Sequence, residues 1–370
     1  MASVAVQQPV NPRPNLKTKM SRDSFYIPNL RPLYKDWPEA LNPNYPELKE
    51  ALSARIDDLY PPQRAAALKK GDYALLSSLW WPRADGKRLK TVTFWFLWLF
   101  TWDDEIDQST SDLFINLDNA NAFRRESLHY ARYSLGVPNE ETDEYRFGVN
   151  PPKNKLIRSL DVIGAELREV YDKDQIMCFV DEIDYYMGCQ QREQARKLAG
   201  GMPEASEYWR TRMGTSAVTS MLALNEFADG QKLPRWIMEH PKMRALWHEV
   251  NMNMSLSNDM LSLRKEIRHG DIDSIVPVLV YTRGMTVQQA IEDTCRELKI
   301  NIERFDKVAA ELLAEVRTAE SAEKWADEVD RFIVGCRYNQ MANFVWSLTT
   351  TRYGLADVPR DATGGMTIIV

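Results

Sequence analysis

The sequence has no excess of positive charge. Its 47 Lys and Arg residues are outnumbered by 53 Asp and Glu residues, so the 370-residue chain carries a formal net charge of −6. No basic cluster exceeds three residues, whereas a protein that follows the phosphates of a nucleic acid needs a basic surface. We therefore expect no nucleic-acid partner.

Cysteine and histidine are also scarce. The four cysteines lie far apart within apolar helical patterns, which excludes a disulfide framework and a zinc motif and predicts reduced, buried thiols. The four histidines are not spaced as metal ligands, so we expect them at the surface or at helix ends. These residues are Cys178, Cys189, Cys295, Cys336, His129, His240, His248 and His269.

Long apolar runs and glycine-rich motifs are missing. The longest apolar run, at 91–102, has 12 residues, and about 18 are needed to cross a bilayer. The 16 glycines form neither a nucleotide-binding loop nor a hydrolase nucleophile elbow. Residues 1–24 lack the apolar core of a signal peptide and are rich in Pro, Asn and Gln. We expect a disordered arm at 1–24, no membrane span and a cytoplasmic protein.

Helical spacing of apolar residues recurs along almost the whole chain. The apolar residues between 156 and 170 recur at steps of four and three, and Asp72 and Thr286 stand where helix N-caps are expected. Alternation typical of strands is confined to the terminal TIIV. Because composition does not change along the chain, we predict one all-α domain at 25–370, built as a helical bundle.

Three carboxylates follow the aromatic run directly. On a helix, Asp103 and Asp107 lie about 40° apart with Asp104 at their flank, while Glu105 points away. Carboxylates held this close favour a hard divalent cation such as Mg²⁺, which also accepts phosphate oxygens. A solvated acidic helix end is the alternative, but the neighbouring rings favour an apolar pocket with a metal at its rim.

A second polar stripe begins at residue 258. Asn258, Ser262 and Glu266 recur every four residues, so an amide, a hydroxyl and a carboxylate oxygen share one helical face. Arg264 and Lys265 add positive charge beside them. Such a stripe is often only solvated, yet Asn and Ser are poor residues for the middle of a helix, which favours a functional use here.

Together, these two motifs resemble those of the class I terpene synthases, in particular the single-domain microbial sesquiterpene cyclases. The matching residues are Asp103, Asp104 and Asp107 in D-D-x-x-D, and Asn258, Asp259, Ser262, Lys265 and Glu266 in N-D-x-x-S-x-x-K-E. Arg212 stands where the family has its diphosphate-sensing arginine, and Arg352 and Tyr353 match its Arg-Tyr pair. Trp346 matches a cavity aromatic. The resemblance covers about 25–355.

The resemblance implies a bundle around a central apolar cavity and a three-ion Mg²⁺ cluster, with Mn²⁺ as a substitute. The implied metal ligands are Asp103, Asp104, Asp107, Asn258, Ser262 and Glu266. Arg212, Lys265, Arg352 and Tyr353 would bind the diphosphate of an isoprenyl diphosphate, with farnesyl diphosphate favoured, and Phe96, Phe100 and Trp346 would line the cavity. The implied reaction releases diphosphate and cyclises the carbocation in a monomer or a homodimer.

One departure and two alternatives accompany this interpretation. Where the family often has a glycine in the helix break after its arginine, this chain has Ser216, and Gly214 is expected to supply the backbone freedom instead. A chain-elongating prenyl diphosphate synthase would carry a second aspartate-rich motif in place of Asn258, Ser262 and Glu266. A non-catalytic helical interaction protein would leave both stripes solvated.

Overall fold

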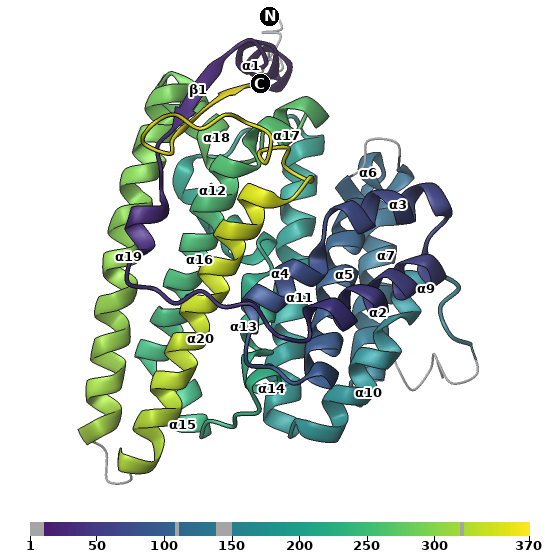
Figure 1. Cartoon of the computed structure of the whole chain (residues 1–370). Helices are drawn as coiled ribbons and strands as arrows, with labels where there is room; N and C mark the ends of the chain where they lie inside the picture. Colours follow the sequence, from purple (N-terminus) through teal and green to yellow (C-terminus); the bar gives the residue numbers. More distant parts are fainter. Residues whose placement is uncertain (1–10, 108–110, 138–149, 319–321) are drawn as a thin grey trace, which may run out of the picture.

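The computed structural model describes residues 11–107, 111–137, 150–318 and 322–370 (Figure 1). Its first half is helical apart from one short strand. In chain order the elements are α1 (Arg13–Met20), β1 (Ser24–Ile27), the 3-10 helix η1 (Arg31–Tyr34), α2 (Tyr45–Leu59), α3 (Pro62–Lys70), α4 (Tyr73–Trp80), α5 (Gly86–Asp107), α6 (Asp112–Ile115), α7 (Leu117–Ser134), α9 (Lys155–Arg158), α10 (Leu160–Val170) and α11 (Lys173–Leu198).

The second half contains the longest helices. Its elements are α12 (Ala205–Thr215), α13 (Val218–Leu222), α14 (Asn225–Asp229), α15 (Arg235–Met238), α16 (Pro241–Leu261), α17 (Leu263–His269), α18 (Ile275–Arg283), α19 (Val287–Thr318), α20 (Ala322–Thr349) and β2 (Met366–Ile369). None of the described helices is both long and apolar enough to cross a membrane.

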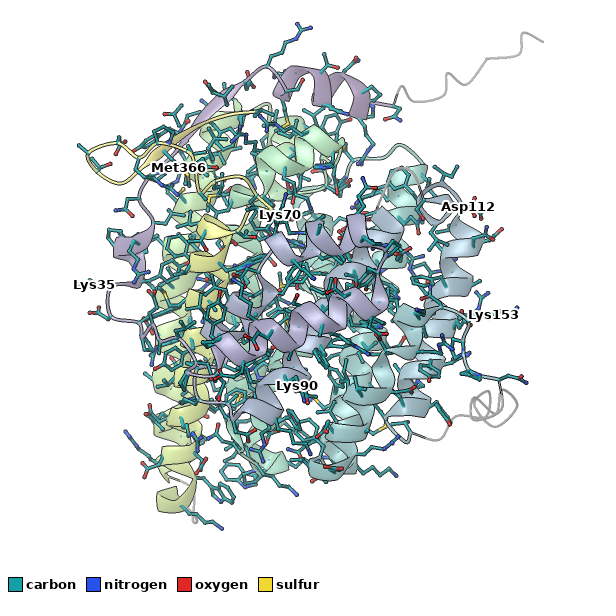
Figure 2. All side chains as sticks on the ribbon, turned by 45° about the vertical axis from the view of Figure 1, so that its right-hand side comes forward. Lys35, Lys70, Lys90, Asp112, Lys153 and Met366 are labelled. Carbon is teal, nitrogen blue, oxygen red and sulfur yellow. The ribbon has the colours of Figure 1, made fainter. Side chains whose placement is uncertain are left out.

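The helices pack in two groups on either side of a central region. Helix α16 packs against α19 and α20, which form one side of the molecule in Figure 1. Helix α5 packs against α2, α4 and α10, and α2 and α3 lie across the face that is turned forward in Figure 2. Helices α4 and α20 contact one another and join the two groups. The helical bundle that the sequence predicts is therefore present.

The predicted helical fold class is confirmed, and one short pair of strands accompanies the helices. Strands β1 and β2 form an antiparallel two-stranded sheet in which Ser24 lies opposite Ile369. The apolar side chains of Phe25, Ile27 and Ile368 face the core, which explains why this short pair forms. The backbone N–H of Tyr26 also donates to the Gln288 side chain of α19 at 2.8 Å. The predicted extended run at the C-terminus is thus confirmed.

The predicted disordered arm is wrong in part. Residues 1–10 lie outside the described residues, but α1 is a helix whose Leu16 and Met20 are buried. Arg13 forms an ion pair with Asp273, which is 1% exposed, and donates to the Gly201 carbonyl at 3.1 Å. This long-range ion pair and the two buried side chains hold α1 on the bundle, and composition alone could not reveal them.

The aromatic run at 91–102 lies within α5 and divides between two faces of that helix. Trp95 packs edge-on against Phe179 of α11, and Trp102 stacks on Phe123 of α7. Phe96 and Phe100 point the other way, toward α4 and α20, and Phe100 lies 5.8 Å from the Trp346 ring centroid. One face of α5 therefore builds the core, while the other is free to line a cavity.

Candidate active site

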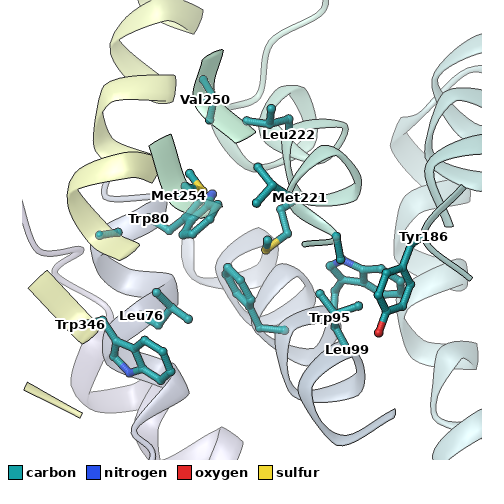
Figure 3. Packing of buried hydrophobic residues seen from close by; sticks show 14 of the residues in the cluster. Leu76, Trp80, Trp95, Leu99, Tyr186, Met221, Leu222, Val250, Met254 and Trp346 are labelled. Carbon is teal, nitrogen blue, oxygen red and sulfur yellow. The ribbon is translucent and has the colours of Figure 1, made fainter. Parts of the chain in front are cut away.

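A cavity of about 200 Å³ lies between the two helix groups and opens to solvent at one end. One part of its wall is apolar. The side chains of this part that Figure 3 labels come from α4, α13, α16 and α20 and point toward one another. The rest is polar and acidic. The apolar part comprises Leu76, Trp80, Phe96, Phe100, Val218, Met221, Met254 and Trp346.

The cavity brings together almost every residue that the sequence singles out. All predicted site residues except Asp104 line it: Phe96, Phe100, Asp103, Asp107, Arg212, Asn258, Ser262, Lys265, Glu266, Trp346, Arg352 and Tyr353. Sequence reasoning missed Gln190, Glu193, Asp271 and Asp273, which also line it. The polar end is therefore broader than the two motifs.

Asp103 is one of the two carboxylates of α5 that line the cavity. Its Oδ1 accepts hydrogen bonds from the Tyr186 hydroxyl at 2.9 Å and from the Gln190 amide, both on α11. Burial, reinforced by the charge of Asp104, raises the pKa of Asp103 to about 6. A half-buried carboxylate that has only neutral hydrogen-bond partners leaves negative charge available for a cation.

Asp104 and Glu105 face elsewhere and are already paired. Asp104 Oδ1 lies 2.9 Å from an Arg352 nitrogen, and this charge lowers the pKa of Asp104 although burial opposes the change. Glu105 forms an ion pair with Arg64. The helical geometry predicted from the sequence is thus confirmed, and Asp104 is a partner of Arg352 at the rim of the cavity.

Asp107 lies in a cluster of charges that spans α5, α11 and the loop after α17. Asp107 lines the cavity but is exposed, and Lys197 is the cation that acts on it most strongly. Lys197 Nζ lies 3.0 Å from Glu193 and 3.4 Å from Asp271. Because Lys197 already supplies a positive charge here, this corner is less open to a metal ion than the surroundings of Asp103.

The second motif lies on the opposite side of the cavity, at a helix junction. Helix α16 ends at Leu261 and α17 begins at Leu263, so the continuous helix that the sequence predicts is interrupted at Ser262. Asn258, Ser262 and Glu266 still share one face, because the Ser262 N–H donates to the Asn258 carbonyl and the Glu266 N–H donates to the Ser262 carbonyl. The Ser262 hydroxyl lies against Glu266 Oε1.

Glu266 has the chemistry expected of a metal ligand. Its Oε2 is buried and has no hydrogen-bond partner among the described residues. Burial, together with the charges of Asp271 and Asp259, raises the pKa of Glu266 to about 7. An unpartnered buried carboxylate oxygen is costly unless a cation binds to it, so the donor set fits a divalent ion. No three His, Cys, Asp or Glu side chains of the described residues converge on one metal position.

Arg212, at the end of α12, is held by the same motif. Its guanidinium donates to Asn258 Oδ1 at 2.7 Å and lies 2.9 Å from Asp259 Oδ1. Asp259 also accepts the Tyr208 hydroxyl and, at 2.9 Å, the Ile275 N–H. Asp259 is therefore an anchor that orients Arg212, and its neighbour Asn258 faces the cavity.

Two further cations and a phenol complete the polar end. Asn258 donates to the Tyr353 hydroxyl at 2.9 Å, and the Arg352 guanidinium lies over the Phe100 ring at 5.3 Å. Burial and the charge of Arg352 lower the pKa of Lys265. Residues from three parts of the chain thus place positive charge at one end of an apolar cavity, which is a suitable arrangement for a large anion that carries a hydrocarbon.

The helix break after Arg212 differs from the sequence prediction. Helix α12 ends at Thr215, and Ala217 adopts a left-handed conformation with φ of 55° before α13 begins. Gly214 stays helical, and a Cβ there would lie 2.2 Å from Cys189 Sγ. Gly214 is thus needed for close packing of α12 on α11, and Ala217 rather than Gly214 makes the break.

Comparisons with known proteins agree with this geometry. Residues 95–304 match the family described as "Terpene synthase family 2, C-terminal metal binding". The chain is 66% identical to the sesquiterpene cyclase hepA of Aspergillus oryzae over 98% of this chain and 97% of that protein. It is 29% identical to terpene cyclase 4 of Gibberella fujikuroi, over 88% of this chain and 81% of that protein.

Solved structures share the fold. The α-eudesmol synthase structure superposes with a TM-score of 0.72 at 16% identity and covers 85% of this chain and 98% of its own. A hedycaryol synthase structure gives a TM-score of 0.70 at 18% identity, with 85% and 97% covered.

The chain belongs to the terpene synthase family. It is a class I terpene cyclase, as the sequence predicts, and its family is one that binds a divalent metal ion.

The raised pKa values predict how the metal-free protein responds to pH. In the folded protein, Asp103 and Glu266 keep their protons to a higher pH than usual, because the pKa of each is raised. In the unfolded chain, the same carboxyl groups are mostly ionised by pH 5. The free energy of unfolding therefore falls as pH rises from about 4 to about 7. We expect the Tm of protein stripped with a chelator to be several degrees lower at pH 7.5 than at pH 5.5.

Mg²⁺ with inorganic diphosphate serves as the control, because bound cations neutralise these carboxylates and should remove most of that fall. A Tm that is constant or rises over this range would contradict the placement of the two carboxylates.

Proposed function

We propose that the substrate is farnesyl diphosphate and that the product is a sesquiterpene hydrocarbon or alcohol. The observation that carries this proposal is a single cavity with cations at one end and aromatic and apolar side chains along the rest. The relative hepA, at 66% identity, is described as a sesquiterpene cyclase, which supports a substrate of fifteen carbons.

We propose that Mg²⁺ binds on both sides of the polar end. Asp103 would hold it from α5, and Asn258, Ser262 and Glu266 would hold it from the junction of α16 and α17. Three ions, replaceable by Mn²⁺, would suit a site whose protein ligands lie on two walls and which also accepts a diphosphate. When bound, the metal supplies Lewis-acid charge that stabilises the departing diphosphate.

The chain's own cations would bind and orient the diphosphate. Arg212 is fixed by Asp259 and Asn258, and Tyr353 is fixed by Asn258. Lys265 and Arg352 stand beside them at the polar end. Preorganised donors of this kind stabilise the charge that develops on a leaving group without reorganising during the reaction.

The aromatic wall would protect the allylic cation that remains. Phe96, Phe100 and Trp346 line the cavity. The faces of aromatic rings attract a cation by about 0.5–2 kcal/mol and offer no reactive lone pair. The indole N–H of Trp346 donates to backbone carbonyls at the end of α3, away from the cavity centre. The rings also exclude water until cyclisation is complete.

The proposal is tested with purified protein, Mg²⁺ and farnesyl diphosphate. We expect a terpene product by gas chromatography and mass spectrometry together with stoichiometric release of diphosphate, both abolished by a chelator. Geranyl and geranylgeranyl diphosphate serve as length controls. Isopentenyl diphosphate, added with an allylic diphosphate, would be consumed only by a chain-elongating synthase, and that result would contradict cyclisation.

Trp80 is predicted to limit substrate length. It lies in the apolar wall and packs edge-on against Phe96, with ring centroids 5.1 Å apart, where α4 ends. Removing the indole in Trp80→Ala deepens the cavity, so turnover of geranylgeranyl diphosphate relative to farnesyl diphosphate should rise about 10-fold. Trp95→Ala removes an equal ring from the side of α5 that packs on α11, outside the cavity lining, and should leave the ratio unchanged. An unchanged ratio in Trp80→Ala would contradict this role.

A further inference from the structure

The turn between α3 and α4 contacts the part of the chain that carries several active-site residues. Three successive backbone carbonyls of this turn, from Lys70 to Asp72, accept hydrogen bonds from the end of α20 and the residues after it. The Trp346 indole N–H donates to the Gly71 carbonyl at 2.9 Å and to the Asp72 carbonyl at 3.2 Å. Figure 2 labels Lys70 beside the end of α20.

The contacts continue beyond the end of α20. The Thr350 hydroxyl donates to the Gly71 carbonyl at 3.0 Å, and the Thr351 hydroxyl donates to the Lys70 carbonyl at 2.8 Å. Arg352 and Tyr353 follow directly and line the polar end of the cavity. One turn of three residues therefore fixes both an aromatic wall residue and the segment that carries two diphosphate-binding candidates.

The side chain of Asp72 fixes the turn itself. It caps α4 by accepting the Leu75 N–H at 3.2 Å, and it also accepts the Tyr45 hydroxyl at 2.8 Å and pairs with Lys49 at 2.7 Å. Its backbone has φ of 48°, in the left-handed region that Asp and Asn tolerate better than other residues with a side chain. The carbonyl of this same residue faces Trp346.

We propose that Asp72 is a positioning residue for the cyclase site. It touches neither substrate nor metal; it sets the orientation of three carbonyls, and these place the Trp346 ring and the Arg352–Tyr353 segment. The expected effect of Asp72 on the products rests on the proposed function. A displaced Trp346 ring would shield a different face of the carbocation, and a displaced Arg352–Tyr353 segment would bind diphosphate more weakly.

The chain offers a matched control for this proposal. Asp172 caps α11 by accepting the Gln175 N–H at 2.9 Å and pairs with Lys232 at 2.8 Å, so it has the same residue type, cap and lysine partner. It does not line the cavity. Asp172→Ala should therefore lower the Tm through the same lost cap and lysine pair, though by less than Asp72→Ala because Asp172 is not left-handed, and it should not affect the reaction.

The experiment compares Asp72→Ala, Asp72→Asn and Asp172→Ala. With farnesyl diphosphate and Mg²⁺, Asp72→Ala should lower kcat about 10-fold and change the proportions of products. Asp72→Asn, which keeps the cap and the left-handed backbone, should restore both. Should Asp72→Ala not fold, Asp72→Gly keeps the backbone conformation and loses all three side-chain contacts, and it carries the same expectation.

A second measurement does not depend on turnover. Mg²⁺ with inorganic diphosphate should raise the Tm of the wild type and of Asp172→Ala equally, and that of Asp72→Ala by less than half as much. An inactive wild type that still shows this difference would contradict the proposed substrate and leave the positioning role intact. Equal product proportions and equal Tm shifts in Asp72→Ala and Asp172→Ala would overturn the positioning role.

Discussion

Asp103→Asn is expected to lower kcat at least about 100-fold with farnesyl diphosphate and Mg²⁺, while the fold persists. The substitution removes one negative charge from the cavity but keeps an oxygen that can accept the hydrogen bonds from Tyr186 and Gln190. The loss should be partly overcome by raising Mg²⁺, because the proposed defect is in metal affinity. Steady-state kinetics as a function of Mg²⁺ measure it.

Glu105→Gln is the control within the same motif. Glu105 lies two residues further on and pairs with Arg64 outside the cavity, so its loss should cost little activity. If Asp103→Asn turned over like the wild type, or if Glu105→Gln lost as much activity, the assignment of metal binding to the cavity face of α5 would be wrong.

Glu266→Gln is expected to have opposite effects on activity and on stability. Turnover should fall at least about 100-fold, because the substitution removes a proposed metal ligand. Metal-free protein at pH 8 should nevertheless melt at the same temperature or higher, because a buried carboxylate with an unpartnered oxygen becomes neutral. Thermal unfolding with a chelator at pH 5.5 and pH 8 measures this, and the pH-dependent fall in Tm should be smaller than in the wild type.

Asn301→Ala provides the matched comparison for stability. Asn301 is also buried and has an unpartnered side-chain oxygen, but its amide nitrogen donates to Glu249 at 2.7 Å and the residue does not line the cavity. The Asn301→Ala substitution should lower the Tm and leave turnover unchanged. A Glu266→Gln protein that is as active as the wild type, or that melts well below it at pH 8 without metal, would refute the role proposed for Glu266.

Much of the site could be predicted because it depends on helical periodicity. The placement of Asp103 and Asp107 toward the cavity, and of Glu105 away from it, follows from 100° per residue. The same arithmetic separates Phe96 and Phe100 from the core tryptophans of α5. The Asn258 stripe was predicted for the same reason, and it survives a helix break that the sequence does not signal.

The remaining features depend on contacts between distant segments. Gln190 and Lys197 lie on a helix with many polar residues, and nothing in their spacing indicates which of them face α5. The left-handed Ala217 carries no sequence signal, because alanine is a strong helix former. The ordering of α1 depends on an ion pair between Arg13 and Asp273, which are 260 residues apart.

The pairing of β1 with β2 has a consequence for synthesis on the ribosome. The partner of Ser24 is Ile369, and at about 5–20 residues per second the strand emerges tens of seconds before its partner is translated. During that time β1 is an open strand edge on a nascent chain, with the apolar Phe25 and Ile27 uncovered. A strand translated much later thus protects β1, and Arg352 and Tyr353 reach the site only shortly before that protection is complete.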